Sequence, residues 1–204
     1  GRHPPFDQGE HLPGLGPLLV VAAVALERPR HRPFSAFRPE LGQVSPSGYI
    51  EPGKQVCDGM TQAQMDEVIE AYARGAAKAV ELGFDGIELH GAHGYIIDQF
   101  LWKALNHRSD KYGGSPRARG QFAAEVVQAC RERLEPGMPI VLRMSNWKMV
   151  DFAARLADTP QELEELLAPV VEAGIELFDC SQRRFWEPCF EDEGDLNLAG
   201  WVKK

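Results

Sequence analysis

The chain has 204 residues and a formal net charge of −8, with 44% hydrophobic and 25% charged residues. This length suits one domain with its own core, and the acidic balance argues against a nucleic-acid surface. The four cysteines form no CxxC pair, which argues against a zinc ribbon or an iron–sulfur cluster, and we interpret them as reduced thiols of a cytosolic protein.

The first 44 residues contain no pattern typical of a domain. Residues 1–16 and 27–40 are rich in Gly, Pro, Arg and His and show neither helix nor strand periodicity. Leu15–Leu26 is the one long apolar run, and it is shorter than the about 20 residues that cross a bilayer. Acidic rather than basic residues precede it, so we predict no membrane span, no signal peptide and a cytoplasmic location. We leave residues 1–44 unassigned.

After residue 44 the sequence becomes regular, and residues 45–204 form the predicted domain. A turn-rich loop leads to Thr61, which makes a capping box with Gln64 at the start of a helix. Apolar residues then recur at helical spacing until Gly83, which suits the position after a helix where φ is positive. A buried strand, Phe84–His90, follows at once.

Two more helices and two more strands follow in alternation. Ser115 and Pro116 suit the N-cap and the first position of a helix, and Thr159 makes a capping box with Glu162. The predicted strands are residues 84–90, 139–144 and 175–180, and a further helix begins at Asn197. Such alternation predicts an α/β fold with a parallel sheet, but periodicity alone does not separate a barrel from a doubly wound sheet.

Candidate chemistry concentrates where the first of these strands ends. His90, His93 and Tyr95 follow one another in HGAHGY, with a Gly-rich turn predicted directly after His90. Ligands bind at the carboxyl ends of parallel strands, so these side chains are candidates for a binding site. Two alternatives stay open: hydrogen-bonded structural histidines, and a metal pair with Glu88 or His107 as a third ligand.

Three blocks in this order resemble the Old Yellow Enzyme family: HGAHGYIIDQFL, NHRSDKYGGS (106–115) and VLRMS (141–145). The resemblance covers residues 45–204 and implies a TIM (β/α)8 barrel that is incomplete, with the central strands only. It also implies an enzyme, an FMN-dependent NAD(P)H oxidoreductase that reduces the C=C bond of α,β-unsaturated carbonyl compounds. The expected partner is a small enone-type molecule, with a homo-oligomer or a completing partner as further options.

The resemblance implies a role for four side chains. His90 and His93 bind the substrate carbonyl oxygen, and Tyr95 donates a proton to the substrate α-carbon. Arg143 lies against the flavin ring, whose anionic reduced form its permanent charge stabilises. The alternatives are a packing role for Tyr95 and an ion pair of Arg143 with Glu88 or another neighbour. We interpret the middle block as a structural loop with an Arg108–Asp110 ion pair.

Most of the family's FMN contacts have no counterpart in the sequence. The resemblance implies a glutamine on an early barrel strand and a phosphate-binding segment near the last strands, and neither motif is present. Residues 21–25 can be encoded so that a shifted frame reads Leu-Gln-Leu-Trp-His, the expected early motif. Residues before 45 are therefore either partly an out-of-frame translation or a divergent N-terminus. The alternatives to an enzyme of this type are a non-catalytic partial barrel that binds no flavin and a metal-dependent hydrolase.

Overall fold

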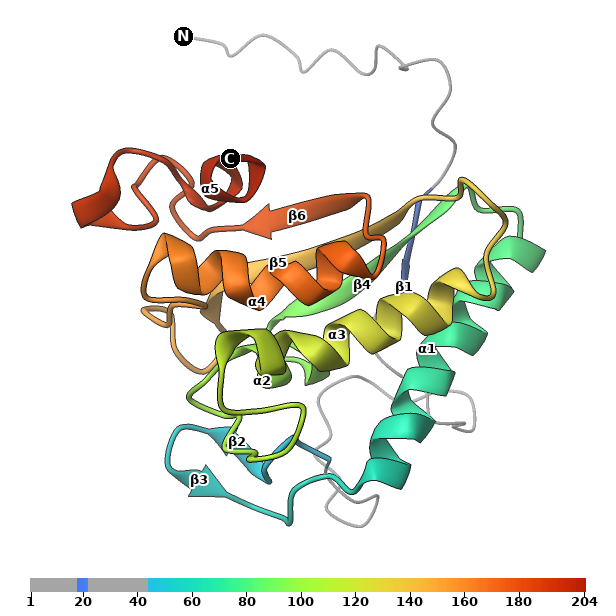
Figure 1. Ribbon diagram of the computed structural model, residues 1–204, viewed down its shortest axis with the longest axis horizontal. Helices are drawn as coiled ribbons and strands as arrows, with labels where there is room; N and C mark the ends of the chain where they lie inside the picture. The colour runs from blue at the N-terminus through green and yellow to red at the C-terminus, as the bar shows by residue number, and fades with distance from the viewer. Residues whose placement is uncertain (1–17, 22–43) are drawn as a thin grey trace, which may run out of the picture.

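A parallel sheet of four strands forms the centre of the protein (Figure 1). The computed structural model describes residues 18–21 and 44–204. The strands are β1 (Leu18–Val21), β4 (Gly86–His93), β5 (Ile140–Lys148) and β6 (Leu177–Ser181). They lie in the order β1-β4-β5-β6, and each neighbouring pair is parallel. A separate antiparallel hairpin joins β2 (Tyr49–Glu51) to β3 (Lys54–Gln55).

Three long helices pack beside one another against this sheet (Figure 1). They are α1 (Gln62–Glu81), α3 (Pro116–Arg131) and α4 (Pro160–Glu172). The short helix α2 (Ile96–Leu101) follows β4, while a 3-10 helix (Glu191–Glu193) and α5 (Leu198–Lys203) follow β6. The prediction of three parallel strands that are neighbours in chain order is confirmed by β4, β5 and β6.

Capping residues explain where α1 and α3 begin. Thr61 Oγ1 accepts a hydrogen bond from the Gln64 amide at 3.3 Å, and the Gln64 side chain accepts one from the Thr61 amide at 2.9 Å. This reciprocal pair is the predicted capping box. Ser115 caps α3 as predicted, because its Oγ accepts from the Ala118 amide at 3.2 Å.

The capping box predicted at α4 forms only in half. Thr159 Oγ1 accepts from the Glu162 amide at 3.1 Å, but the Glu162 carboxylate does not reach back to Thr159. It accepts instead from the Asp158 amide at 2.7 Å and from Arg119 at 2.8 Å. Arg119 is buried in α3 and also donates to the Leu101 carbonyl at 3.0 Å. Glu162 is therefore the counter-charge that a buried guanidinium requires.

Strand alternation gives the sheet an apolar face and a polar face. The apolar face carries the fully buried side chains Ile87, Leu89, Leu142 and Met144, which pack with the helices in one core. Burying each such side chain contributes roughly 1.5–3 kcal/mol relative to leaving it exposed. His90 and Arg143 alternate with these residues, so they lie on the opposite, polar face.

Two strands run further than the sequence predicted. β4 continues to His93 where a turn was expected, and β5 continues to Lys148. The pairing shifts register between Gly91 and His93, which marks a β-bulge. A Cβ on Gly91 would lie 2.8 Å from Leu142 Cδ1 and 3.1 Å from the Arg143 carbonyl oxygen. Gly91 therefore lies in a tightly packed part of the strand, and the turn predicted to begin there begins at Gly94 instead.

β1 lies in the segment that the sequence left unassigned. Its backbone pairs in parallel with β4, from Leu18 opposite Gly86 to Val21 opposite Leu89. Residues 22–25, on which the shifted-frame interpretation also depends, lie outside the described residues, so that interpretation stays a prediction. Within the part of the chain that the structure describes, β1 and β6 each have a strand on one side only.

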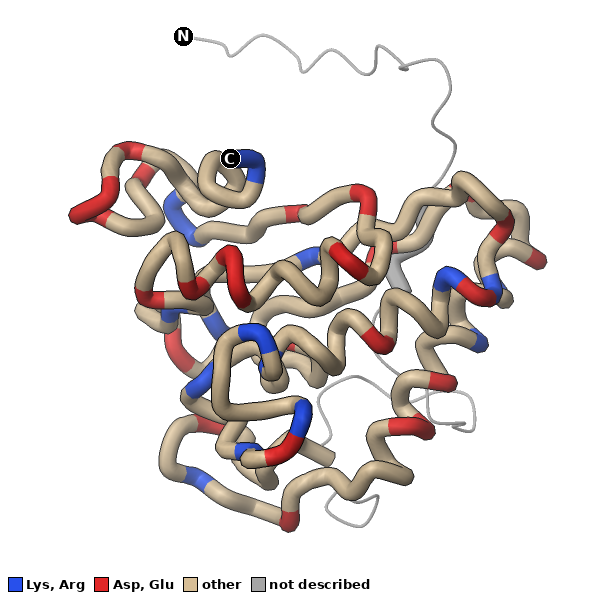
Figure 2. Tube along the Cα trace, in the orientation of Figure 1, with Lys and Arg blue, Asp and Glu red and all other residues tan. Residues whose placement is uncertain are grey.

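Charged residues of both signs are distributed along the whole described part of the chain (Figure 2). Acidic residues gather between β6 and α5, where Glu191–Glu193 form the 3-10 helix. None of the helices in the described ranges is both long and apolar enough to cross a membrane.

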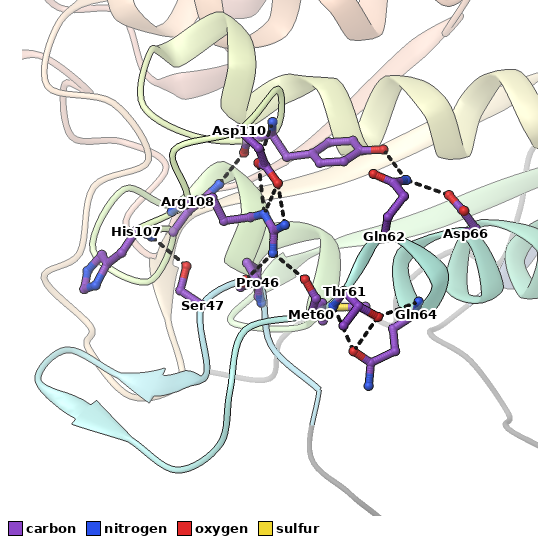
Figure 3. Close-up of polar contacts among 12 residues, drawn as sticks. Pro46, Ser47, Met60, Thr61, Gln62, Gln64, Asp66, His107, Arg108 and Asp110 are labelled. Atoms are coloured by element: carbon purple, nitrogen blue, oxygen red, sulfur yellow. Dashed lines mark hydrogen bonds and ion pairs between the residues drawn. The ribbon is translucent and has the colours of Figure 1, made fainter.

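Arg108 fixes the loop 106–115 against the segment before α1 (Figure 3). Its Nη1 donates to the carbonyls of Pro46 and Met60, both at 2.7 Å, and its Nε donates to Asp110 at 3.0 Å. The hydrogen bonds from Arg108 to Asp110 hold the pKa of the Asp110 carboxyl below its usual value. The Arg108–Asp110 ion pair is confirmed, and the loop has the structural role that was predicted.

Replacing Gly120 of α3 by alanine tests how closely α3 and α4 pack. A Cβ there would lie 2.2 Å from the Leu166 carbonyl oxygen and 2.7 Å from Pro169 Cγ. In an open helix Gly→Ala stabilises by about 1 kcal/mol. Here we expect the overlap to dominate, so that the free energy of unfolding falls by about 1–3 kcal/mol in urea denaturation. The difference between Gln128→Ala and Gln128→Gly, at an exposed position of the same helix, measures the propensity. A Gly120→Ala variant that gains stability would contradict the packing.

Candidate active site

A row of polar side chains crosses the polar face of the sheet. His90 of β4, Arg143 of β5 and Asp179 of β6 occupy paired positions on adjacent strands. Arg143 Nη1 donates to Asp179 Oδ2 at 2.7 Å, and their side chains are 37% and 36% exposed. Glu88 lies on the same face two residues before His90, and burial, followed by the charge of Asp179, raises the pKa of its carboxyl. Arg143 therefore lies beside His90 but pairs with Asp179 rather than with Glu88.

His93 ends β4 in a conformation that most residues avoid. Its φ is 61°, in the left-handed region, and Gly94 follows with a φ of 90°. Left-handed backbone costs a residue with a Cβ about 1–2 kcal/mol. The His93 amide donates to Ser145 Oγ at 2.8 Å, and the His93 carbonyl accepts from the Met149 amide at 3.3 Å. Contacts from β5 and from the residue after it therefore hold this conformation.

A buried ion pair fixes the turn after His93. Lys148 Nζ donates to Asp98 Oδ1 at 2.6 Å and to the Ser145 carbonyl at 2.9 Å, and neither charged side chain is exposed. The other carboxylate oxygen of Asp98 accepts from the Gly94 amide at 2.6 Å. Burial raises the pKa of Asp98 and lowers the pKa of Lys148, and the attraction between the two charges opposes both shifts. The pair joins α2, the end of β5 and the turn into one unit.

The three side chains that the sequence singled out lie together. The centroid of the His90 ring is 5.4 Å from that of His93 and 5.0 Å from that of Tyr95. Tyr95 is the N-cap residue of α2 and is 39% exposed. Two imidazoles and a partly exposed phenol therefore share the carboxyl end of β4, which is the arrangement predicted from HGAHGY.

The His93 ring is held by groups from the neighbouring strands. Its Nε2 lies 2.9 Å from Ser181 Oγ, and Trp147 Nε1 donates to the same oxygen at 3.1 Å. Trp147 also packs on the imidazole, with ring centroids 4.3 Å apart. Ser181 at the end of β6 pairs in register with Ser145 of β5. Two serines on adjacent strands therefore bind His93, one at its main chain and one at its ring.

The surroundings of both histidines favour the neutral ring at pH 7. Burial lowers the pKa of His90, and the charge of Arg143 lowers it further. Burial, followed by the charges of His90 and Arg143, lowers the pKa of His93 to about 4. A neutral imidazole has one N–H donor and one acceptor nitrogen. Each histidine can therefore donate one hydrogen bond without carrying a charge.

Sequence reasoning missed the groups that support the histidines, which are Asp98, Ser145, Trp147, Lys148 and Ser181. Asp98 carried a signal that could have been used, because a carboxylate inside the apolar run IIDQFL has to find a buried partner. The others carried none. Lys148 lies 50 residues from Asp98, and Ser181 lies 88 residues from His93.

The metal-site alternative requires a third ligand beside His90 and His93. Across residues 18–21 and 44–204, no three His, Cys, Asp or Glu side chains lie close enough together to hold a metal ion. His107 lies in the Arg108 loop, where its Nε2 meets the Ala104 carbonyl at 3.1 Å.

Residues 25–185 match the profile of a protein family described as the NADH:flavin oxidoreductase / NADH oxidase family. The NADPH dehydrogenase of Geobacillus sp. (strain WCH70) is 48% identical over 137 residues, which cover 63% of this chain and 40% of that protein. The chanoclavine-I aldehyde reductase of Penicillium roqueforti is 33% identical over 162 residues, which cover 79% of this chain and 43% of that protein. The chain spans about two fifths of the length of these curated relatives.

A solved structure has the same fold. The old yellow enzyme homologue from Zymomonas mobilis matches with a TM-score of 0.58 at 22% identity, over 68% of this chain and 41% of that chain. At this identity the likeness establishes the fold alone. The described residues form part of a parallel sheet with its helices and not a closed barrel, which agrees with the predicted incomplete (β/α)8 barrel.

Replacing Lys148 by methionine removes the partner of a buried carboxylate. We expect the free energy of unfolding at pH 8 to fall by about 3–5 kcal/mol, because Asp98 is left buried and charged. The folded-state pKa of Asp98 is raised above its unfolded value, so the variant should regain stability as the pH falls and Asp98 binds a proton. Urea denaturation at pH 8 and pH 5 measures both effects.

The control for this prediction is the double variant Lys148→Met/Asp98→Asn, which has no charge at the site. It should lose less stability than Lys148→Met at pH 8, and its stability should depend less on pH. Equal losses in the single and double variants at both pH values would show that the charge of Asp98 does not matter.

An NMR titration of the histidine rings tests the environment of His93. The His93 resonances should titrate near pH 4, because its pKa falls from 6.5 to about 4. Between these values the unfolded chain binds more protons than the folded chain, so His93 makes stability fall as the pH is lowered from 6.5 through 4. His93→Asn removes the titrating ring and should flatten this part of the stability curve. A His93 midpoint at its ordinary value would refute the desolvated environment.

Proposed function

Because the chain belongs to the NADH:flavin oxidoreductase / NADH oxidase family, we propose that it carries the substrate-binding part of an FMN-dependent NAD(P)H oxidoreductase. The substrates are α,β-unsaturated carbonyl compounds, and the reaction reduces their C=C bond. The observation that carries the proposal is the grouping of His90, His93 and Tyr95 at one strand end. The names of the relatives, an NADPH dehydrogenase and an aldehyde reductase, support a reduction with a nicotinamide donor.

His90 and His93 bind the carbonyl oxygen of the substrate in this proposal. Their ring centroids are 5.4 Å apart, so one oxygen can accept a hydrogen bond from each ring. Both rings are neutral, so each donates a hydrogen bond and keeps its proton. Two donors on one oxygen withdraw electron density from a conjugated C=C bond and make its β-carbon electrophilic.

Tyr95 supplies the proton that completes the reduction. A hydride forms the new C–H bond at the β-carbon, and the electron pair of the C=C bond then takes the phenol proton at the α-carbon. Phenols stay protonated at neutral pH, so Tyr95 can act as an acid there. Water restores the proton to the phenolate after the step. The Tyr95 ring lies 5.0 Å from that of His90, so the acid and the carbonyl-binding groups share one end of the strand.

FMN is the cofactor of this family, and when bound it supplies the hydride. Arg143 fits one edge of the flavin ring, because its guanidinium lies on the polar face beside His90 and is 37% exposed. A permanent cation suits the electron-rich edge of a reduced ring. A phosphate group needs several backbone donors, and the sequence lacks the motifs that supply them in the family. The described residues therefore fit the ring edge and not the phosphate.

A partial barrel that binds no flavin is the second candidate function. The ion pair between Arg143 and Asp179 favours it, because this pair gives the guanidinium a counter-charge without a ligand. The two candidate functions differ in the partner of Arg143, which is the flavin in the enzyme and Asp179 in the partial barrel.

A chimera tests the proposed function. Residues 45–204 replace the aligned segment of the Geobacillus NADPH dehydrogenase, whose remaining chain supplies the rest of the barrel. We expect a yellow protein that oxidises NADPH when 2-cyclohexenone is added. His90→Ala and His93→Ala should each slow alkene reduction about 10²–10³-fold, because each removes one donor to the developing negative charge. Tyr95→Phe should slow reduction but leave phenol binding unchanged.

The matched control is Tyr49→Phe, in the β2–β3 hairpin, which should leave turnover unchanged. Titration of the 204-residue chain itself with FMN, followed by flavin fluorescence, should show weak binding or none. Saturable micromolar binding at one site per chain would mean that the chain holds more of the flavin site than Arg143. A yellow chimera whose histidine variants reduce the enone as fast as the parent would refute the assigned roles.

A further inference from the structure

Ser181 Oγ is shared by two nitrogen atoms. It lies 2.9 Å from His93 Nε2 and 3.1 Å from Trp147 Nε1. An indole N–H is a donor only, so Ser181 accepts from Trp147. The hydroxyl still has one proton to donate and one further lone pair. The direction of the hydrogen bond to His93 therefore depends on which ring nitrogen of His93 carries the proton.

The two neutral tautomers of His93 satisfy this network differently. With the proton on Nδ1, Nε2 accepts from the Ser181 hydroxyl, and the hydrogen bonds run in one direction from Trp147 through Ser181 to His93. With the proton on Nε2, Ser181 accepts twice, and its own proton has no partner among the hydrogen bonds of the described residues. A hydrogen bond left unmade costs on the order of 1 kcal/mol, so the Nδ1–H tautomer is favoured.

We propose that Ser181 is a positioning residue that holds His93 in the Nδ1–H tautomer, so that His93 presents its single proton to the substrate oxygen from Nδ1. Within residues 18–21 and 44–204, no hydrogen bond uses Nδ1 of His93, so this nitrogen is the one left for a ligand. The inference rests on the proposed function for the identity of the ligand. The tautomer itself depends only on Ser181 and Trp147.

The surroundings keep the His93 ring in this orientation. Trp147 packs on the ring with centroids 4.3 Å apart and planes tilted by 36°, and the His90 ring lies at 5.4 Å. Ser145 fixes the His93 main chain and is paired in register with Ser181 on the next strand. A half-turn of the ring would carry Nε2 away from Ser181 and break this hydrogen bond. The backbone and the ring of His93 are therefore held by separate groups.

Histidine-selective ¹⁵N NMR of the 204-residue chain at pH 7 measures the tautomer without flavin or substrate. We expect the wild-type spectrum to show Nδ1 of His93 as the protonated nitrogen. Ser181→Ala should move His93 toward the Nε2–H form that unrestrained imidazole favours, whereas Ser181→Thr keeps the hydroxyl and should keep the Nδ1–H form. A wild-type His93 protonated on Nε2, or an unchanged tautomer in Ser181→Ala, would overturn the inference.

Backbone amide spectra show whether each variant is folded. If Ser181→Ala fails to fold, the wild-type and Ser181→Thr spectra still decide, because both must show the Nδ1–H form.

A second experiment measures the binding of phenol to the flavin-containing chimera. Ser181→Ala should raise the Kd for phenol about three- to tenfold, because only the molecules in the competent tautomer bind. Ser181→Thr should bind phenol like the parent. Equal phenol affinity in the parent and Ser181→Ala would overturn the positioning role. A chimera that binds flavin but no phenol, with the expected NMR result, would instead overturn the proposed function and leave the tautomer assignment in place.

Discussion

The ion pair between Asp98 and Lys148 is the constraint on which the candidate site depends. Neither side chain is exposed, so the two charges cannot separate without leaving one buried alone. Asp98 also binds the Gly94 amide, and Lys148 also binds the Ser145 carbonyl, so the pair fixes helix α2 against the end of β5. His93 lies between these contacts. The ion pair therefore fixes the elements around His93, while Ser145 and Ser181 bind His93 itself.

The sequence predicted those features that depend on residues close to one another along the chain. Thr61 and Gln64 are three residues apart, so the start of α1 followed from local chemistry alone. The grouping of His90, His93 and Tyr95 was visible for the same reason. The contacts that complete the site join residues 50 and 88 positions apart, and no periodic pattern encodes such pairs. The residues that support the histidines could therefore be identified only in the folded structure.

The end of β4 was not predicted correctly, because glycine is typical of two different structures. Gly91 suggested a turn, because glycine is common where a chain reverses. In the structure a Cβ at this position would make a tight contact of 3.1 Å with the Arg143 carbonyl oxygen, and β4 continues past it through a bulge to pair His93 with Lys148. A turn and a close approach favour the same residue, and only the neighbouring strand decides between them.

The left-handed backbone at position 93 restricts which amino acids can replace His93. Apart from glycine, the residues that adopt this conformation most readily are asparagine, aspartate and histidine, and the φ of His93 is 61°. Of these three, asparagine and the neutral histidine carry an N–H group in the side chain, whereas an ionised aspartate carries none. Substitutions that preserve the turn therefore tend to preserve a donor as well. The backbone at position 93 therefore restricts which side chains fit before their chemistry matters.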